Sequence, residues 1–208
     1  MPTPAIDWVL FDWGNVIVEY RPASFPKLAD KLGAPLSDVT GFLLDTGLLR
    51  DLCKGILEPE AGLERFAERF GRRLSRAEVV ECFRADVEHA LPGIDELLSD
   101  LEGVARLAIL SNTFFGHWDS FVDSELYRRF ELPMASHLLG GTKPDPAIYQ
   151  AALGRMNAEA ERVVFVDDKQ ENLDTAQALG MHTILSKCSV ETTRAGLLKL
   201  LGPTFATR

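Results

Sequence analysis

The stretch that decides the fold is Trp8-Val9-Leu10-Phe11-Asp12-Trp13-Gly14-Asn15. Four apolar residues lead into a carboxylate and then into a glycine turn. An unbroken apolar run of this length is typical of a central parallel strand, because both of its faces are covered. Ligands bind just beyond the carboxyl ends of such strands. We therefore expect Asp12 to face a crevice, although Asp12 considered alone fits a turn-capping aspartate equally well.

The composition indicates a globular protein with one sizeable core, or a core with a smaller lobe. The chain has 208 residues, of which 46% are hydrophobic and 25% charged, and its formal net charge is -9. No basic stripe offsets this charge, which argues against nucleic-acid binding. An anionic substrate stays possible, because a bound divalent cation can invert the local field.

The cysteines and the start of the chain suggest in which cellular compartment the protein acts. Cys53, Cys82 and Cys188 are scattered without a CxxC pair, so we expect neither a disulfide framework nor a structural zinc site. The first strand begins within a few residues of the start, which predicts no signal peptide. No apolar run approaches the roughly 18 residues of a membrane span. We expect a cytoplasmic protein without membrane contact, acting as a monomer or homodimer.

Helical spacing dominates residues 25–90, and Ser75 with Glu78 forms a predicted capping box. A helical run this long exceeds a simple crossover between parallel strands. It predicts a small α-helical cap domain at residues 21–90, inserted into a core made of residues 1–20 and 91–208.

Strands and helices alternate in the rest of the chain. The strands are expected at Arg106–Leu110, Met134–Leu139, Val163–Val166 and His182–Leu185. This alternation predicts an α/β fold with a Rossmann-like parallel sheet sandwiched by helices.

Polar residues follow three of the apolar strands: Asp12, the pair Ser111-Asn112 and the pair Asp167-Asp168. Lys143 lies in a glycine- and proline-rich loop. Each has a simpler explanation alone, as a helix cap or an exposed lysine. Together they converge, because the carboxyl ends of parallel strands share one edge. Two adjacent carboxylates repel each other unless a cation is near, and carboxylate oxygens suit Mg²⁺. A carboxylate can also attack phosphorus to form an aspartyl-phosphate.

Four segments in order resemble the motifs of the haloacid dehalogenase superfamily of hydrolases. They are Phe11-Asp12-Trp13-Gly14-Asn15-Val16, Leu110-Ser111-Asn112-Thr113, Lys143-Pro144-Asp145-Pro146-Ala147-Ile148-Tyr149, and Phe165-Val166-Asp167-Asp168 with Asn172. The resemblance runs from about Asp7 to Leu185 and includes the inserted cap. It is a specific resemblance, because all four motifs occur in the family's order.

The resemblance implies a role for each matched residue. Asp12 is expected to be the nucleophile, and Lys143 to steady it and bind the phosphoryl group with Ser111 and Asn112. Mg²⁺ is the implied cofactor.

The implied ligands of the Mg²⁺ ion are Asp12, the Gly14 backbone carbonyl and Asp168, with Asp167 as a further candidate. Asn172 is expected to support the metal ligands.

One position departs from the family's phosphatases, which usually carry a second aspartate as general acid and base two residues after the nucleophile. That residue is Gly14 here. The departure resembles a subgroup with an aspartate-x-glycine-asparagine motif, which includes sugar-phosphate phosphatases. Glu19 is a candidate replacement, although a solvated surface glutamate explains it as well.

The sequence therefore predicts a Mg²⁺-dependent phosphatase of small phosphorylated metabolites, with sugar phosphates as one class. The alternatives are a metal-independent 2-haloacid dehalogenase and a non-catalytic phosphate-binding or regulatory relative. Candidates for substrate contact, equally plausible as packing or surface residues, are Trp13, Asn15, Thr46, Arg50, Lys54, Phe114 and His117.

Overall fold

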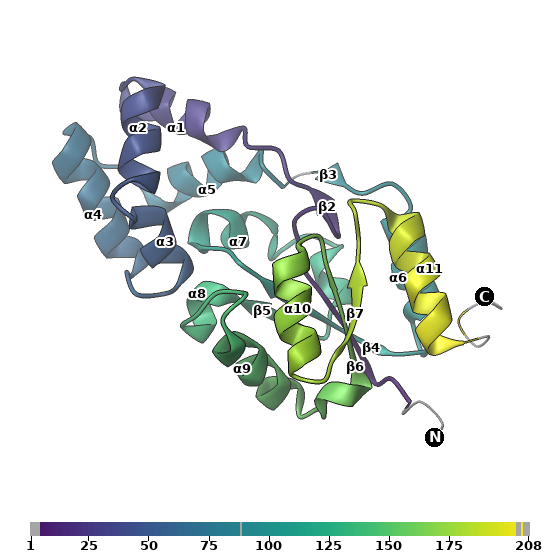
Figure 1. Cartoon of the computed structure of the whole chain (residues 1–208). Helices are drawn as coiled ribbons and strands as arrows, with labels where there is room; N and C mark the ends of the chain where they lie inside the picture. The colour runs from purple at the N-terminus through teal and green to yellow at the C-terminus, as the bar shows by residue number, and fades with distance from the viewer. Residues whose placement is uncertain (1–4, 88, 203–204, 206–208) are drawn as a thin grey trace.

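The computed structural model describes residues 5–87, 89–202 and 205. A five-stranded parallel sheet with the strand order β5-β4-β1-β6-β7 forms its centre (Figure 1). The strands are β1 (Trp8–Phe11), β4 (Arg106–Ser111), β5 (Leu132–Ala135), β6 (Val163–Asp167) and β7 (His182–Leu185). The predicted α/β fold is confirmed, and the opening stretch supplies the middle strand.

Helices cover both faces of the sheet (Figure 1). On one face lie α6 (Ile94–Leu101), α7 (Phe115–Phe121) and α11 (Val190–Leu201), and on the other α9 (Pro146–Met156) and α10 (Gln170–Ala178). Val9 and Phe11 point to the first face, whereas Trp8 and Leu10 point to the second. Because both faces of β1 are buried, all four of its residues must be apolar.

Five helices follow β1 and form a separate apolar cluster. They are α1 (Ser24–Leu32), α2 (Leu36–Leu44), α3 (Leu48–Cys53), α4 (Pro59–Phe70) and α5 (Arg76–Arg84). The predicted capping box of Ser75 and Glu78 begins α5. Their shared cluster also takes in Phe114 and Phe115, which lie at the start of α7. The helices thus pack against the start of α7, while the domain division at residues 20/21 and 90/91 stays a prediction.

Two predicted boundaries were wrong. The helical run does not continue to residue 90, because β3 (His89–Ala90) pairs antiparallel with β2 (Val18–Glu19). The predicted strand Met134–Leu139 is instead β5 followed by α8 (Ser136–Leu139). Ala135 pairs with Ser111, the last residue of β4, so a longer β5 would have no partner there. Two short 3₁₀ turns, Tyr127–Arg129 and Ala160–Arg162, complete the elements.

Across the described parts of the chain, none of the helices is both long and apolar enough to span a bilayer.

Candidate active site

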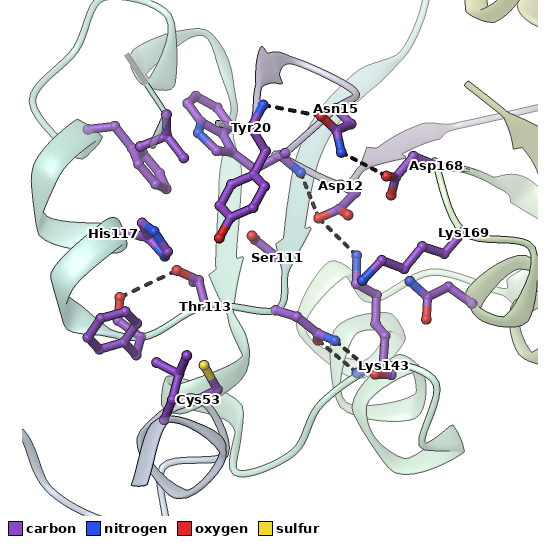
Figure 2. A pocket seen from close by; sticks show the side chains of 18 residues that line it. Asp12, Asn15, Tyr20, Cys53, Ser111, Thr113, His117, Lys143, Asp168 and Lys169 are labelled. Carbon is purple, nitrogen blue, oxygen red and sulfur yellow. Dashed lines mark hydrogen bonds and ion pairs between the residues drawn. The ribbon is translucent and has the colours of Figure 1, made fainter. Parts of the chain in front are cut away.

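A cavity of about 460 Å³ lies at the carboxyl ends of β1, β4 and β6 (Figure 2). The predicted nucleophile, phosphate-binding residues and acidic residues converge there as the parallel sheet requires. Its lining consists of Asp12, Trp13, Gly14, Asn15, Tyr20, Leu49, Cys53, Val87, Ser111, Asn112, Thr113, Phe114, His117, Phe121, Lys143, Asp168, Lys169 and Asn172.

Lys143 connects two of the carboxylates. Its Nζ lies 2.9 Å from Asp12 Oδ1 and 2.7 Å from Asp167 Oδ2, and its side chain is fully buried. Burial alone would lower the pKa of Lys143, but the charges of Asp12 and Asp167 outweigh it and the pKa is raised. The ammonium therefore stays charged where a phosphoryl group would need positive charge.

Asp12 follows β1 directly, and its side chain is 13% exposed. The Trp13 backbone N–H donates to Asp12 Oδ1 over 2.7 Å, which orients the carboxylate. Burial raises the pKa of Asp12 to about 6, against the opposing effect of Lys143 and with a further contribution from Asp167. A carboxylate that is oriented, partly accessible and poorly solvated has the properties of a nucleophile.

The loop that carries Lys143 is fixed by Asn112. The Asn112 side-chain N–H₂ donates to the Lys143 carbonyl over 2.8 Å, and the Lys143 backbone N–H donates to Asn112 Oδ1 over 2.8 Å. Asn112 thus uses its amide to position the lysine loop at the cavity. Ser111, at the end of β4, is 6% exposed and lines the cavity with its side chain.

Three carboxylates lie close enough to share a cation. One oxygen from each of Asp12, Asp167 and Asp168 lies within 4.8 Å of the others. Asn172 donates its side-chain N–H₂ to both oxygens of Asp167, at 2.9 and 3.0 Å, and its buried Oδ1 has no hydrogen-bond partner within the described residues. Clustered carboxylates beside an unpaired acceptor fit a hydrated Mg²⁺ ion, which keeps several of its waters.

The turn after Asp12 holds one of these carboxylates in place. Asn15 adopts a left-handed conformation with φ 59°. Its Nδ2 donates to Asp168 Oδ2 over 3.0 Å, and its Oδ1 accepts from the Tyr20 N–H over 3.1 Å. Asn15 therefore connects the turn to the acidic cluster. Glu19, the candidate replacement acid, is half-exposed and ion-paired with Arg21 at 2.6 Å, and it is not among the residues that line the cavity.

The predicted substrate contacts divide into two groups. Trp13, Asn15, Phe114 and His117 line the cavity, whereas Thr46, Arg50 and Lys54 are not among its lining residues. Trp13 is 2% exposed and stacks on Phe121 with ring centroids 4.4 Å apart, so packing accounts for most of its surface.

Several wall residues were not predicted from the sequence, namely Tyr20, Leu49, Cys53 and Val87. Asp86, which is buried between helices, was not predicted either. Asp86 accepts hydrogen bonds from the backbone N–H groups of Ala23 and Ser24, and from His117 Nε2 at 2.9 Å. Burial tends to raise the pKa of Asp86, but the hydrogen bonds from His117 and Ser24 outweigh it and the pKa is lowered. No sequence motif marks Asp86, since its partners come from distant segments.

Comparisons with known proteins found a matching family and several relatives. The profile of the haloacid dehalogenase-like hydrolases matches residues 6–180. Mouse Acyl-CoA dehydrogenase family member 10 is 30% identical over 62% of this chain, although the match spans only 13% of that protein. Sesquiterpene phosphatase astK of Aspergillus oryzae is 27% identical over 83% of this chain and 85% of its own length. D-ribitol-5-phosphate phosphatase of Bacteroides thetaiotaomicron is 26% identical over 84% and 89%, respectively.

Solved structures share the fold. A predicted HAD-like family hydrolase from Porphyromonas gingivalis has a TM-score of 0.73 at 25% identity, covering 86% of this chain and 90% of that one. A HAD family enzyme from Bacteroides thetaiotaomicron, in complex with magnesium and inorganic phosphate, has a TM-score of 0.72 at 24% identity, covering 86% and 92%. With a matched profile over most of its length and the expected residues around one cavity, the chain belongs to the haloacid dehalogenase-like hydrolase family.

Proposed function

We propose that this hydrolase is a Mg²⁺-dependent phosphatase of small phosphorylated molecules, acting through an aspartyl-phosphate on Asp12. The arrangement around Asp12 carries the proposal. The Asp12 carboxylate faces the cavity, and its Oδ1 lies 2.9 Å from the buried Lys143 ammonium. The carboxylates of Asp167 and Asp168 lie beside it. A nucleophile, a fixed cation and a candidate cation site around one space suit transfer of a phosphoryl group.

Different side chains of the protein carry out different parts of the proposed reaction. An Asp12 oxygen attacks phosphorus while the bond to the substrate's leaving oxygen breaks, which gives an acyl phosphate and an alcohol. Water then attacks the same phosphorus, releases inorganic phosphate and restores the carboxylate. Lys143 and the Ser111 hydroxyl would hold the phosphoryl oxygens, and Asn112 keeps Lys143 in place through both of its amide contacts.

Asp12, Asp168 and the Gly14 carbonyl are the proposed holders of Mg²⁺. When bound, the ion supplies positive charge to the phosphoryl oxygens. Asp167 is assigned a different task, because Lys143, Asn172 and the Lys169 N–H already engage its oxygens. We propose that Asp167 chiefly holds Lys143, with Asn172 supporting it.

The relatives support this choice. Two proteins that match most of this chain are named as phosphatases, one of a sesquiterpene and one of D-ribitol 5-phosphate. A structural neighbour holds magnesium and inorganic phosphate. The proposal therefore extends to phosphate monoesters as a class, with sugar phosphates as one group to test.

The test is phosphate release from a panel of sugar, isoprenoid and aryl phosphates, with Mg²⁺ and with EDTA. Wild type should release phosphate only with Mg²⁺, and Asp12→Asn should abolish release. Asp174→Asn is the matched control, because Asp174 is exposed on α10 and bonds Gln170. Intact release by Asp12→Asn would contradict the mechanism. Chloride release from 2-haloacids in EDTA would favour the dehalogenase, and Mg²⁺ and phosphate binding without turnover would favour the non-catalytic relative.

A further inference from the structure

The glycine at position 14 leaves the proposed reaction without its expected proton donor, and its surroundings show what stands in that place. A Cβ built on Gly14 would lie 3.5 Å from the Cβ of Tyr20. A side chain at position 14 would thus begin in ordinary contact with the start of the Tyr20 side chain.

Tyr20 is placed to reach a leaving group. Its backbone N–H donates to Asn15 Oδ1 over 3.1 Å, which ties it to the turn after Asp12. Figure 2 shows its hydroxyl pointing into the cavity, on the side where Ser111 lies. Tyrosine is one of the side chains that serve as general acids.

Behind Tyr20 lies a histidine with a buried partner. The Tyr20 and His117 rings meet edge to face, with centroids 5.9 Å apart. His117 Nε2 bonds Asp86 Oδ2 at 2.9 Å, and Asp86 is 1% exposed. Asp86 therefore occupies one ring nitrogen and leaves Nδ1 free of hydrogen bonds to the described residues. A chain of contacts runs from position 14 through Tyr20 and His117 to Asp86.

We propose that this Tyr20–His117–Asp86 cluster replaces the aspartate missing at position 14: the Tyr20 hydroxyl protonates the leaving oxygen, and His117, held by Asp86, resupplies the proton. The inference rests on the proposed phosphatase function and assigns its general acid and base. Tyr20 is the catalytic residue of the cluster, while His117 and Asp86 act through it as positioning residues.

The protons balance over one turnover. As the bond between phosphorus and the leaving oxygen breaks, the Tyr20 hydroxyl proton passes to that oxygen and yields the alcohol. The Tyr20 oxygen takes the proton carried by His117 Nδ1, directly or through one water. His117 keeps its Nε2–H, which stays donated to Asp86. When water attacks the aspartyl-phosphate, its proton returns through Tyr20 to His117 Nδ1.

Leaving-group dependence separates proton donation from a structural role. Benzyl phosphate would have to release a benzyl alkoxide, a poor leaving group, unless the leaving oxygen is protonated. p-Nitrophenyl phosphate releases p-nitrophenolate, which leaves readily without a proton. In Tyr20→Phe we expect kcat/KM to fall about 10²–10⁴-fold for benzyl phosphate and less than about tenfold for p-nitrophenyl phosphate. Phenylalanine keeps the ring contacts, so the fold should survive. His117→Gln should shift the ratio of the two kcat/KM values in the same direction.

Tyr127→Phe is the matched control, since Tyr127 packs at the edge of the sheet core and does not line the cavity; its ratio should equal that of wild type. An equal fall for both esters in Tyr20→Phe, or no fall for either, would overturn the assignment of Tyr20. An unchanged ratio in a folded His117→Gln variant would overturn the assignment of His117. If wild type releases phosphate from neither ester and from no member of the phosphate panel, the proposed function fails instead of the inference.

Discussion

Replacing Lys143 by methionine tests the electrostatic design of the site most directly. Methionine fills similar space but removes the only positive charge within 4.0 Å of Asp12 and Asp167 in the described residues. The two carboxylates would then lie close to each other and to Asp168 without an ion-pair partner among the described residues.

The two ion-pair distances give the expected loss of stability. At 2.9 and 2.7 Å, each ion pair is worth roughly 6 kcal/mol of gross Coulomb energy at an effective dielectric constant of about 20. Desolvation of the charges offsets much of this attraction, so removing one partner of a buried pair costs about 3–5 kcal/mol net. Burial raises the pKa of Asp12 to about 6, so proton uptake by Asp12 relieves the repulsion and the loss should be smaller at pH 5 than at pH 8. A divalent cation should relieve it as well.

Urea unfolding with and without Mg²⁺ measures both effects. Lys143→Met should lower the free energy of unfolding by about 3–5 kcal/mol in EDTA, and Mg²⁺ should raise the urea midpoint more in this variant than in wild type. Lys169→Met is the control, because Lys169 lines the same cavity but is exposed; its effect should stay within about 0.5 kcal/mol. Equal stabilisation of Lys143→Met and wild type by Mg²⁺ would contradict the expected coupling between Lys143 and the cation, and no stabilisation of either protein would refute a cation site at these carboxylates.

Three further outcomes are expected. Asp12 must be ionised to attack, and burial raises its pKa to about 6. The value of kcat/KM should therefore fall as the pH drops below about 6, and this acid limb of the pH profile should move to lower pH as the Mg²⁺ concentration rises. An acid limb that does not move with Mg²⁺ concentration would contradict this expectation. Gly55→Ala should cost at least about 1 kcal/mol more than Gly71→Ala in thermal melts, since only at Gly55 would a Cβ meet a backbone oxygen, that of His137 at 2.3 Å. Asn112→Ala should lower stability by about 1–3 kcal/mol by orphaning the Lys143 backbone groups, measured by urea unfolding.

The parallel core could be predicted because its pattern is local. The run from Trp8 to Phe11 has no polar residue, and its short length before the turn at Gly14 favours a strand buried on both faces over a buried helix. Strand ends depend instead on partners: β5 stops at Ala135 because β4 stops at Ser111. A pattern of side chains along one segment carries no information about the length of its neighbour.

The same distinction separates the site residues that the sequence identified from those it missed. Asp12, Lys143 and Asp168 follow strand ends or occupy motifs, so their convergence follows from the topology. Asp86 and Tyr20 owe their positions to the packing of α5 and the β2 segment against α7, which no local pattern specifies. Asn112 was predicted to bind phosphate, whereas in the structure its side-chain amide is hydrogen-bonded to the Lys143 backbone. The sequence does not show which hydrogen-bond partner a side-chain amide has in the folded protein.

The glycine at position 14 offers the final test, because the missing acid can be put back. Gly14 lies outside the left-handed region, and a Cβ there would make an ordinary contact of 3.5 Å with Tyr20, so Gly14→Asp should fold. In the Tyr20→Phe background it should restore benzyl phosphate hydrolysis by at least about tenfold while changing p-nitrophenyl phosphate hydrolysis little, since only the poor leaving group needs the proton. In wild type the same change should leave the ratio of the two esters nearly as it was, because Tyr20 already supplies the acid. A folded, Mg²⁺-binding double variant without rescue would show that position 14 and Tyr20 do not serve the same leaving oxygen.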